Sequence, residues 1–427
     1  MRLWNAIIPY GDRVFRRNFA LNVGNGALSA LGDAFTNSVV MTSFVSQLTS
    51  SNVLVALLVQ IKDGGWFLPQ FFIAPAVERA PLKIVLYRRT TMLRVVAWAL
   101  IVAMALLITD KGALLIGYSV CISFVALSAG MAGLPWQTIT AKIIPARHRG
   151  HLFGMRQFTG SILGIFGSAM LALILSGGMG LTFPRNYALI FGLAAISFLV
   201  AYAMFGRSIE PPDPPVATQT SLRSMVNHAG TILRTNSRYR AFLVLRGLLF
   251  LGNASVPFIT VYARRGLGAD DGYIGAIAVL TIVVGLLTNL MWGRIVDRLG
   301  APRAGGFIAL SGLAATLIVA ALALARPDPQ LALLLLLVPF SLSTMATTGI
   351  GVVGSPMLME IVPADDRVRY FGLTNTVLGL LMLSTSAVGA IGDQSGYGAL
   401  FAICAVAFLA ALFFARRLRA PAPTGER

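Results

Sequence analysis

Long apolar stretches separated by short polar segments recur along the whole chain. Each stretch covers about 17 to 25 residues, the length that an α-helix needs to cross the hydrocarbon core of a bilayer. Backbone groups in lipid must satisfy their hydrogen bonds within the segment, which favours helices. The pattern therefore predicts twelve transmembrane helices, with spans of 18–43, 53–77, 90–109, 112–141, 152–177, 187–206, 241–263, 272–293, 304–325, 330–359, 370–391 and 397–415.

The composition points to the same class of protein. Of the 427 residues, 56% are hydrophobic and 12% are charged, and the mean hydropathy is +0.78. Soluble domains carry about 25% charged residues. We therefore predict an all-α integral membrane protein.

The basic residues are distributed unevenly among the predicted loops. Most of the 34 Lys and Arg residues fall on one side of the predicted membrane, together with both termini. Basic residues are retained in cytoplasmic loops, so we expect a multi-pass protein of the inner (plasma) membrane with both termini in the cytoplasm. The net charge of +18 then arises from basic residues on the cytoplasmic side, next to anionic lipid headgroups. Nucleic acid is therefore not an expected partner.

One polar segment, residues 207–240, separates the first six spans from the last six. Several prolines near its start are followed by Ser, Thr, Asn and Arg, a composition that is typical of a linker. We predict an amino-terminal six-helix bundle at 1–206, a cytoplasmic linker at 207–240, a carboxy-terminal six-helix bundle at 241–415 and a cytoplasmic tail at 416–427.

The two halves of the sequence repeat each other at an offset of about 219 residues. The matched segments are Leu31-Gly32-Asp33-Ala34 with Leu251-Gly252-Asn253-Ala254, Val77-Glu78-Arg79 with Val296-Asp297-Arg298, and Ile144-Pro145-Ala146 with Val362-Pro363-Ala364. Matches in three separated regions at an almost constant offset indicate an internal duplication.

The loop after the eighth span reads Gly293-Arg294-Ile295-Val296-Asp297-Arg298-Leu299-Gly300-Ala301-Pro302-Arg303. This pattern resembles the inner-loop signature of the major facilitator superfamily, and the twelve spans, the duplication and the central linker extend the resemblance over most of the chain. The resemblance implies two pseudo-symmetric six-helix bundles around a cavity that opens alternately to either side, with the first and fourth helices of each half lining it.

The resemblance also implies that this loop acts as a latch on the inner side. The candidate latch residues of the second half are Gly293, Asp297, Arg298, Gly300 and Arg303. Gly293 permits a close helix approach, Gly300 permits a tight turn, and Asp297 can meet an arginine or the positive end of a helix. The first half retains Glu78 and Arg79 but departs from the pattern at Ala74 and Pro81, which weakens the transfer there.

Three charged residues lie deep within the first two predicted spans. Asp33 is about fifteen residues into the first span, and Lys62 and Asp63 are about ten residues into the second, so all three lie near mid-depth at 1.5 Å per residue. A bare charge there costs about 3 kcal/mol, so it normally faces a polar cavity or a partner. Asp33 and Asp63 are candidate proton carriers with Lys62 as their partner. The alternative is a structural ion pair between Lys62 and either acid.

Two further groups of polar residues are candidate substrate contacts. Trp136 and Gln137 combine an apolar surface with hydrogen-bonding groups, which suits an amphiphilic ligand. Arg156 with Gln157, and separately Arg246, could bind an anionic substrate.

These arginines have an alternative role. Like Arg94, they lie near the predicted inner ends of their spans, where a long side chain can reach water by snorkelling. Asn253 is a candidate of another kind, because it replaces Asp33 at the aligned position of the second half. This asymmetry favours an ion site in the first half and a substrate contact in the second, although simple divergence after duplication also explains it.

The sequence thus predicts a secondary active transporter that moves a small, amphiphilic organic solute by alternating access, with proton-coupled export as the preferred mode. Uptake or uniport of a small organic metabolite is the alternative mode, and a non-transporting membrane receptor or scaffold would share the fold. An enzyme is not expected, because no nucleophile, base and metal ligands converge in the sequence.

The expected partners are the small-molecule solute, protons and membrane lipids, and the expected functional unit is a monomer. We expect no cofactor and no metal. The three histidines, His148, His151 and His228, lie in predicted inner loops without the spacing of zinc ligands. The two cysteines, Cys121 and Cys404, fall in spans of different halves.

Overall fold

The computed structural model describes residues 12–177, 179–213, 230–362 and 367–419. Within these ranges the regular structure consists of helices. The chain forms two compact units, the first built from Met1–Val40 and Ile61–Thr220 and the second from Met41–Gln60 and Ser221–Arg427.

The amino-terminal half of the chain forms the helices of the first six predicted spans. Their bounds are α2 (Arg13–Phe35), α3 (Ser38–Leu48), α4 (Asn52–Gly64), α5 (Leu68–Arg79), α6 (Lys83–Leu107), α7 (Lys111–Ile143), α8 (Ala146–Leu175) and α9 (Arg185–Phe205). The later part of α3 and most of α4 belong by their contacts to the second unit.

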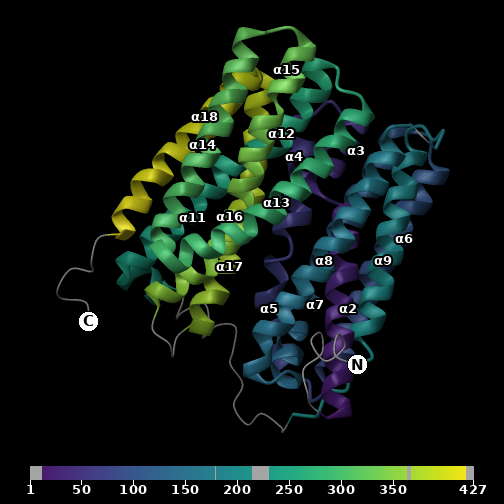
Figure 1. The fold of residues 1–427 in the computed structure, drawn as a ribbon, viewed down its shortest axis with the longest axis vertical. Coiled ribbons are helices and arrows are strands. Elements are labelled where there is room, and N and C mark those ends of the chain that lie inside the picture. The colour runs from purple at the N-terminus through teal and green to yellow at the C-terminus, as the bar shows by residue number, and fades with distance from the viewer. Residues whose placement is uncertain (1–11, 178, 214–229, 363–366, 420–427) are drawn as a thin grey trace. The chain divides into compact units, whose positions relative to one another are not determined.

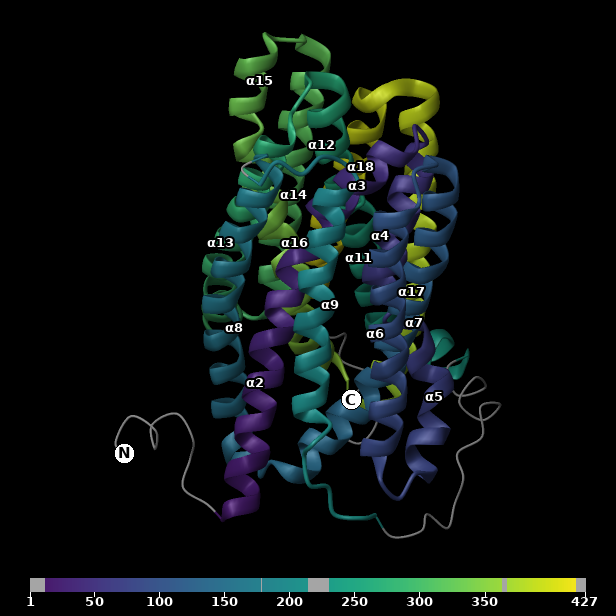
Figure 2. The ribbon, with the colours of Figure 1, turned by 90° about the vertical axis from the view of Figure 1, so that its right-hand side faces the viewer.

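Helix α2 is the centre of packing in the first unit. It runs beside α8 and α9, and α6 runs beside α7 and α9 (Figure 1, Figure 2). Gly160 of α8 faces Ala30 of α2, where an added Cβ would come within 2.9 Å of the alanine methyl group. The glycine therefore permits the close approach of the two helices.

The second unit contains the helices of the carboxy-terminal half. Their bounds are α11 (Ser237–Asn253), α12 (Ser255–Val261), a π-helical turn (Tyr262–Gly266), α13 (Asp271–Leu299), α14 (Ala301–Ala325), α15 (Pro329–Leu335), α16 (Leu337–Ile361), α17 (Arg367–Ser384), a 3₁₀ turn (Thr385–Ala387) and α18 (Val388–Arg419). Helix α14 packs on α16 and α18, α11 packs on α18, and α13 packs on α16.

The predicted spans are accounted for within the described residues. Nine segments there are long and apolar enough to cross a membrane, and one of them, Leu373–Leu418, covers two predicted spans across the non-helical Gly396. The first two predicted spans correspond to the helix pairs α2–α3 and α4–α5. The prediction of an all-α integral membrane fold is confirmed.

The first two spans are broken near their middles, and so is the seventh. Helix α2 ends at Phe35, and Asn37 begins α3 by accepting a hydrogen bond from the Val40 amide at 3.0 Å, which is the bond an amino-terminal cap makes. Helices α4 and α5 are separated at Gly65, and α11 and α12 at Ala254. The breaks in the first spans of the two halves thus fall at aligned positions of the internal repeat.

Candidate functional site

The breaks in the first two spans carry the charged residues that the sequence singled out. Asp33 lies in the last turn of α2, and Lys62 and Asp63 lie in the last turn of α4. The Lys62 Nζ is 3.3 Å from Asp63 Oδ1, and the Ser38 hydroxyl at the start of α3 donates to Asp63 Oδ2 at 3.0 Å. Lys62 therefore lies at the carboxyl end of α4, which carries a partial negative charge. Asp63 meets the amino end of α3, which carries a partial positive charge, and both contacts are favoured by the helix dipoles.

Asp33 belongs to the same cluster and brings in a fourth charge. The charges of Lys62, Arg94 and Asp63 act on the Asp33 carboxyl. Arg94 comes from α6, and its guanidinium carbon lies 4.7 Å from the centre of the Phe198 ring. The structure thus brings the three predicted residues together and adds Arg94, which balances two carboxylates with two cations.

The two acids of this cluster are more exposed than their partner Lys62. Asp33 is an exposed residue, and the side chain of Asp63 is 37% exposed, whereas that of Lys62 is 15% exposed.

The second unit has a neutral residue at the equivalent break. Asn253 is the last residue of α11, and its side-chain oxygen accepts a hydrogen bond from the Thr347 hydroxyl of α16 at 2.8 Å. The first helix of each half therefore has a polar residue in its last turn. This residue is the carboxylate Asp33 in α2 and the amide Asn253, which is bonded to a neighbouring helix, in α11.

Arg156 forms a second polar cluster in the first unit. Its Nη1 donates to the backbone and side-chain oxygens of Asn22 and, at 3.1 Å, to the side-chain oxygen of Asn25. Its guanidinium lies 4.8 Å from the centre of the Trp136 ring. Gln137 and Gln157 are exposed residues, and neither hydrogen-bonds to Arg156 in the described part of the chain.

Arg246 occupies a different environment in the second unit. The residue is only 9% exposed, its guanidinium donates to the Ile350 carbonyl of α16, and it lies 5.1 Å from the centre of the Phe250 ring. A Cβ at Gly354 would come within 2.6 Å of its Nη2, so this glycine of α16 makes room for the guanidinium. Enclosure within the core of the unit favours a packing role for Arg246.

The predicted latch segment forms the turn between α13 and α14. Gly300 has a φ of 81°, a backbone conformation that favours glycine, and the next amide, that of Ala301, donates to Glu360 Oε1 at 3.1 Å. Gly293 and Arg298 lie in α13, Arg303 lies in α14 and Arg79 ends α5. A Cβ at Gly293 would meet no described atom within 4 Å, so the close helix approach expected at this glycine is not seen. The side chains of Asp297 and Glu78 lie outside the described residues, so the latch stays a prediction.

A further set of polar contacts attaches the α3–α4 segment to the rest of the second unit. Arg265 donates to three backbone carbonyls at the end of α3, those of Ser46, Thr49 and Ser50. Asp393 accepts from the Asn52 amide at 3.1 Å. A cation thus caps the carboxyl end of α3 and a carboxylate caps the amino end of α4, which satisfies both helix ends.

Comparisons with known proteins agree with this architecture. Residues 242–427 match the family model of the Major Facilitator Superfamily. No curated protein matches the sequence.

Solved structures share the fold along nearly the whole chain. The nucleoside transporter NupG is similar with a TM-score of 0.74 at 11% identity, covering 94% of this chain and 100% of that one. An auto-inhibited peptide transporter of the POT family gives 0.67 at 15% identity, covering 96% and 98%. A bacterial homologue of the iron transporter ferroportin, in its outward-facing state, gives 0.62 at 16% identity, covering 95% and 99%. These likenesses show the fold.

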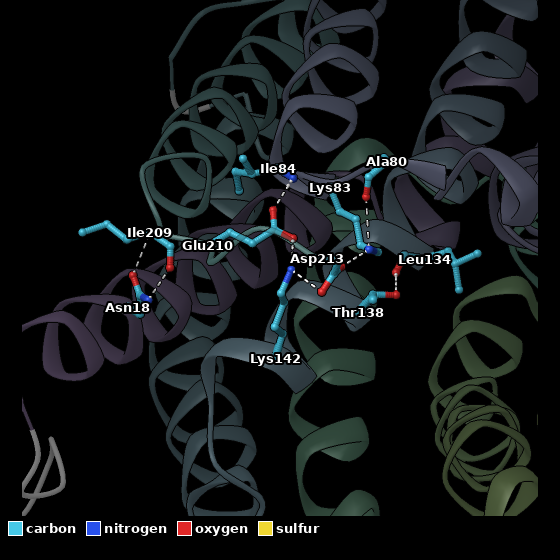
Figure 3. A network of polar contacts seen from close by, with 10 residues as sticks. All are labelled: Asn18, Ala80, Lys83, Ile84, Leu134, Thr138, Lys142, Ile209, Glu210 and Asp213. Carbon is cyan, nitrogen blue, oxygen red and sulfur yellow. Dashed lines mark hydrogen bonds and ion pairs between the residues drawn. The ribbon is translucent and has the colours of Figure 1, made fainter. Parts of the chain in front are cut away.

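The start of the predicted linker is bound to the first unit (Figure 3). Lys142 of α7 is paired with Glu210 at 3.1 Å and with Asp213 at 2.7 Å, and Asp213 is also paired with Lys83 of α6. Glu210 Oε2 accepts from the Ile84 amide at 2.8 Å. The sequence did not reveal this network, because it treated residues 207–240 as one linker and weighed only their prolines and basic residues.

Asp213 makes this network sensitive to acid. Hydrogen bonds from Lys142 and then Lys83 hold its pKa below the usual range. A lowered pKa in the folded state contributes stability above the ordinary value of about 3.9, and that stability is lost as the pH falls through the lowered pKa. Since the side chain is 31% exposed, solvent screening limits the contribution to about 1 kcal/mol or less.

We expect Asp213→Asn to lower the thermal unfolding midpoint of the purified protein slightly at pH 7. The difference from the unsubstituted protein should shrink as the pH approaches 3, because protonation then removes the same charge. Asp328→Asn, at a carboxylate that caps α15, is the matched control. An equal effect of Asp213→Asn at pH 7 and pH 3 would contradict the assignment.

Proposed function

We propose that this protein is a secondary transporter that moves a small, amphiphilic organic solute across the inner membrane by alternating access, with proton-coupled export as its mode. The observation that carries the proposal is the charged cluster at the breaks of the first two spans. Transporters place substrate and coupling-ion sites near the membrane midplane, where spanning helices are discontinuous. Asp33, Lys62 and Asp63 stand at such discontinuities in a fold shared with solved transporters.

Asp33 and Asp63 are the proposed proton carriers. Asp33 is an exposed residue and the side chain of Asp63 is 37% exposed. Lys62 is paired with Asp63, and the charges of Lys62 and Arg94 act on Asp33. A conformational change that moved either cation would change the proton affinity of the acid, and this is the linkage that coupled transport requires. In the alternative uniport mode, the same residues would act as a fixed ion-pair network.

The proposal is tested by transport in proteoliposomes. A panel of amphiphilic cations, anions and neutral solutes would be offered to the reconstituted protein with and without an imposed pH gradient. We expect uptake of at least one compound, faster than in protein-free liposomes and increased by the gradient. Equal permeation in both kinds of liposome for every compound would favour the receptor or scaffold alternative.

The orientation follows from the charge distribution and can be measured independently. After replacement of Cys121 and Cys404, we expect Thr109→Cys to react with a membrane-impermeant maleimide in intact cells and Ala217→Cys to react only after the cells are opened. The first position follows α6 and the second belongs to the predicted linker. The reverse pattern would invert the proposed topology.

The contacts of Arg265 and Asp393 hold the ends of α3 and α4 within the second unit. Without them, the carbonyls at the end of α3 and the Asn52 amide would lose their partners. We expect Arg265→Gln with Asp393→Asn to raise the labelling rate of Ser51→Cys by an impermeant reagent in intact cells several-fold. Arg326→Gln, a change in another predicted outer loop, should leave the rate unchanged. An unchanged rate in the double variant would contradict this role of the two residues.

A further inference from the structure

Arg156 carries a charge that the described residues do not neutralise. In the described part of the chain no carboxylate lies within ion-pair distance of it, and its hydrogen-bond partners are the oxygens of Asn22 and Asn25. Asparagine oxygens orient a guanidinium but leave its charge intact. Arg156 lies five residues beyond His151, where the apolar part of α8 begins, and an uncompensated charge within the apolar part of a spanning helix is costly.

The two asparagines are fixed so that their oxygens face the arginine. The side-chain amide of Asn22 donates to the Thr140 hydroxyl at 3.1 Å, and that of Asn25 donates to the Ala201 carbonyl at 2.9 Å. Both asparagines are buried, with exposures of 0% and 3%. Helices α2, α7 and α9 therefore hold the acceptors in place before any ligand binds.

Only one nitrogen of the guanidinium is used in this arrangement. All its hydrogen bonds in the described part of the chain come from Nη1, and neither Nε nor Nη2 is sealed from solvent. These two nitrogens form the edge that presents parallel N–H donors to a carboxylate or phosphate. Arg246 differs, because its unbonded Nε is buried.

The surroundings of that edge suit an amphiphilic anion. The indole of Trp136 lies against the guanidinium and offers an apolar surface beside the charge. A Cβ at Gly26 would come within 2.8 Å of three atoms of the Arg156 side chain, so this glycine of α2 leaves room for the side chain to lie where it does.

We propose that Arg156, held by Asn22 and Asn25 and flanked by Trp136, binds an anionic group of the transported solute, a carboxylate or phosphate attached to an apolar body. The proposal rests on the transporter function above and adds the substrate class. The same chemistry occurs in the phosphate of a lipid headgroup, and the experiment below separates the two sources.

The test is ligand binding by the full-length protein purified in detergent, read from the thermal unfolding midpoint against ligand concentration. The probes are benzoate and phenyl phosphate, with benzamide as the neutral partner of benzoate. We expect the anions to stabilise the protein and benzamide to have little effect. Arg156→Gln should weaken anion binding at least about tenfold, and Arg156→Lys should weaken it less, because lysine keeps the charge but loses the two-donor edge.

Two further variants separate a binding role from a packing role. Asn22→Asp supplies an internal counter-ion of the same shape, so we expect it to weaken benzoate binding about tenfold while the ligand-free protein stays at least as stable. Arg417→Gln is the control, since Arg417 also stacks on an aromatic ring, that of Phe413 at 4.7 Å, but at the exposed end of α18.

Equal stabilisation by benzoate and benzamide, or undiminished anion binding in Arg156→Gln and Asn22→Asp, would overturn the proposal. Stabilisation by phosphatidylglycerol relative to phosphatidylcholine, with no effect of either soluble anion, would assign the site to a lipid headgroup and also overturn it. The binding assay needs no transport. If the protein binds anions but shows no pH-driven accumulation, the proposal of proton coupling is wrong and the proposal of an anion site at Arg156 is supported.

Discussion

Replacing either Asp33 or Asp63 by Asn is expected to abolish accumulation of the solute driven by a pH gradient, while exchange of the solute down its own gradient continues. The two acids lie at the breaks of the first two spans and are exposed, so they are the proposed carriers of the coupled proton. An amide keeps the shape of the side chain but cannot carry a proton. The linkage between proton and solute is then lost, although binding of the solute need not be.

The measurement compares the two activities in the same proteoliposomes. Counterflow exchange without a gradient reports the conformational cycle, and accumulation under an imposed gradient reports coupling. Asp328→Asn is the control, since it removes a carboxylate outside the cluster, at the start of α15. If Asp33→Asn and Asp63→Asn both retain full pH-driven accumulation, the acids are structural, and coupling lies elsewhere or the protein is a uniporter.

The second large effect is expected from reversing the charge of Lys62. The four charged residues of the cluster are balanced, and Lys62→Glu would leave two uncompensated negative charges beside a side chain that is only 15% exposed in the native protein. Leaving a buried charge unpaired costs about 3 to 5 kcal/mol, and water at Asp63 should hold the cost near the lower value. We expect a large loss of thermal stability and of transport.

A double-mutant cycle tests whether Lys62 acts through Asp33. The variants are Asp33→Asn, Lys62→Gln and the pair together, each assayed for solute exchange. Coupled residues should show an interaction energy of about 0.5 to 3 kcal/mol, so the double variant should be less impaired than the two single changes predict. Additive effects would mean that the two residues act independently.

The sequence predicted the fold because each spanning helix is a continuous apolar segment that can be recognised from the sequence alone. Each predicted span has a counterpart among the described helices, and the internal repeat placed Asp33 opposite Asn253 at the ends of α2 and α11. The break between Phe35 and Ser38 was not predicted, because the hydropathy pattern counted these residues within one span. Thr36, Asn37 and Ser38 are residue types that cap helices, and Asn37 does so here.

The candidate site was predicted only in part, for a related reason. Asp33, Lys62 and Asp63 stand out because charges are rare in apolar spans, whereas Arg94 was indistinguishable from a snorkelling arginine until α6 placed it near Asp33. Asn22 and Asn25 are ordinary polar residues in the sequence. Their relation to Arg156 arises from the packing of α2 against α8, a pairing more than 130 residues apart in the chain.

The attachment of the α3–α4 segment to the second unit could not be predicted from the sequence either. Arg265 and Asp393 lie in predicted outer loops, where an isolated charge carries no information about its partner. Their partners are backbone groups at the ends of α3 and α4, which have no side-chain signature. Only the folded chain shows that a cation meets a carboxyl end and an anion meets an amino end.

The most direct test of proton-coupled export is the proton movement that accompanies solute transport. Proteoliposomes with a trapped pH-sensitive dye would receive, without any imposed gradient, a solute that the panel identifies as transported. Exchange of solute for protons predicts that the interior becomes more alkaline as the solute enters, and that neither Asp33→Asn nor Asp63→Asn shows this change. Entry of the solute with no change of internal pH, or with acidification, would contradict the account.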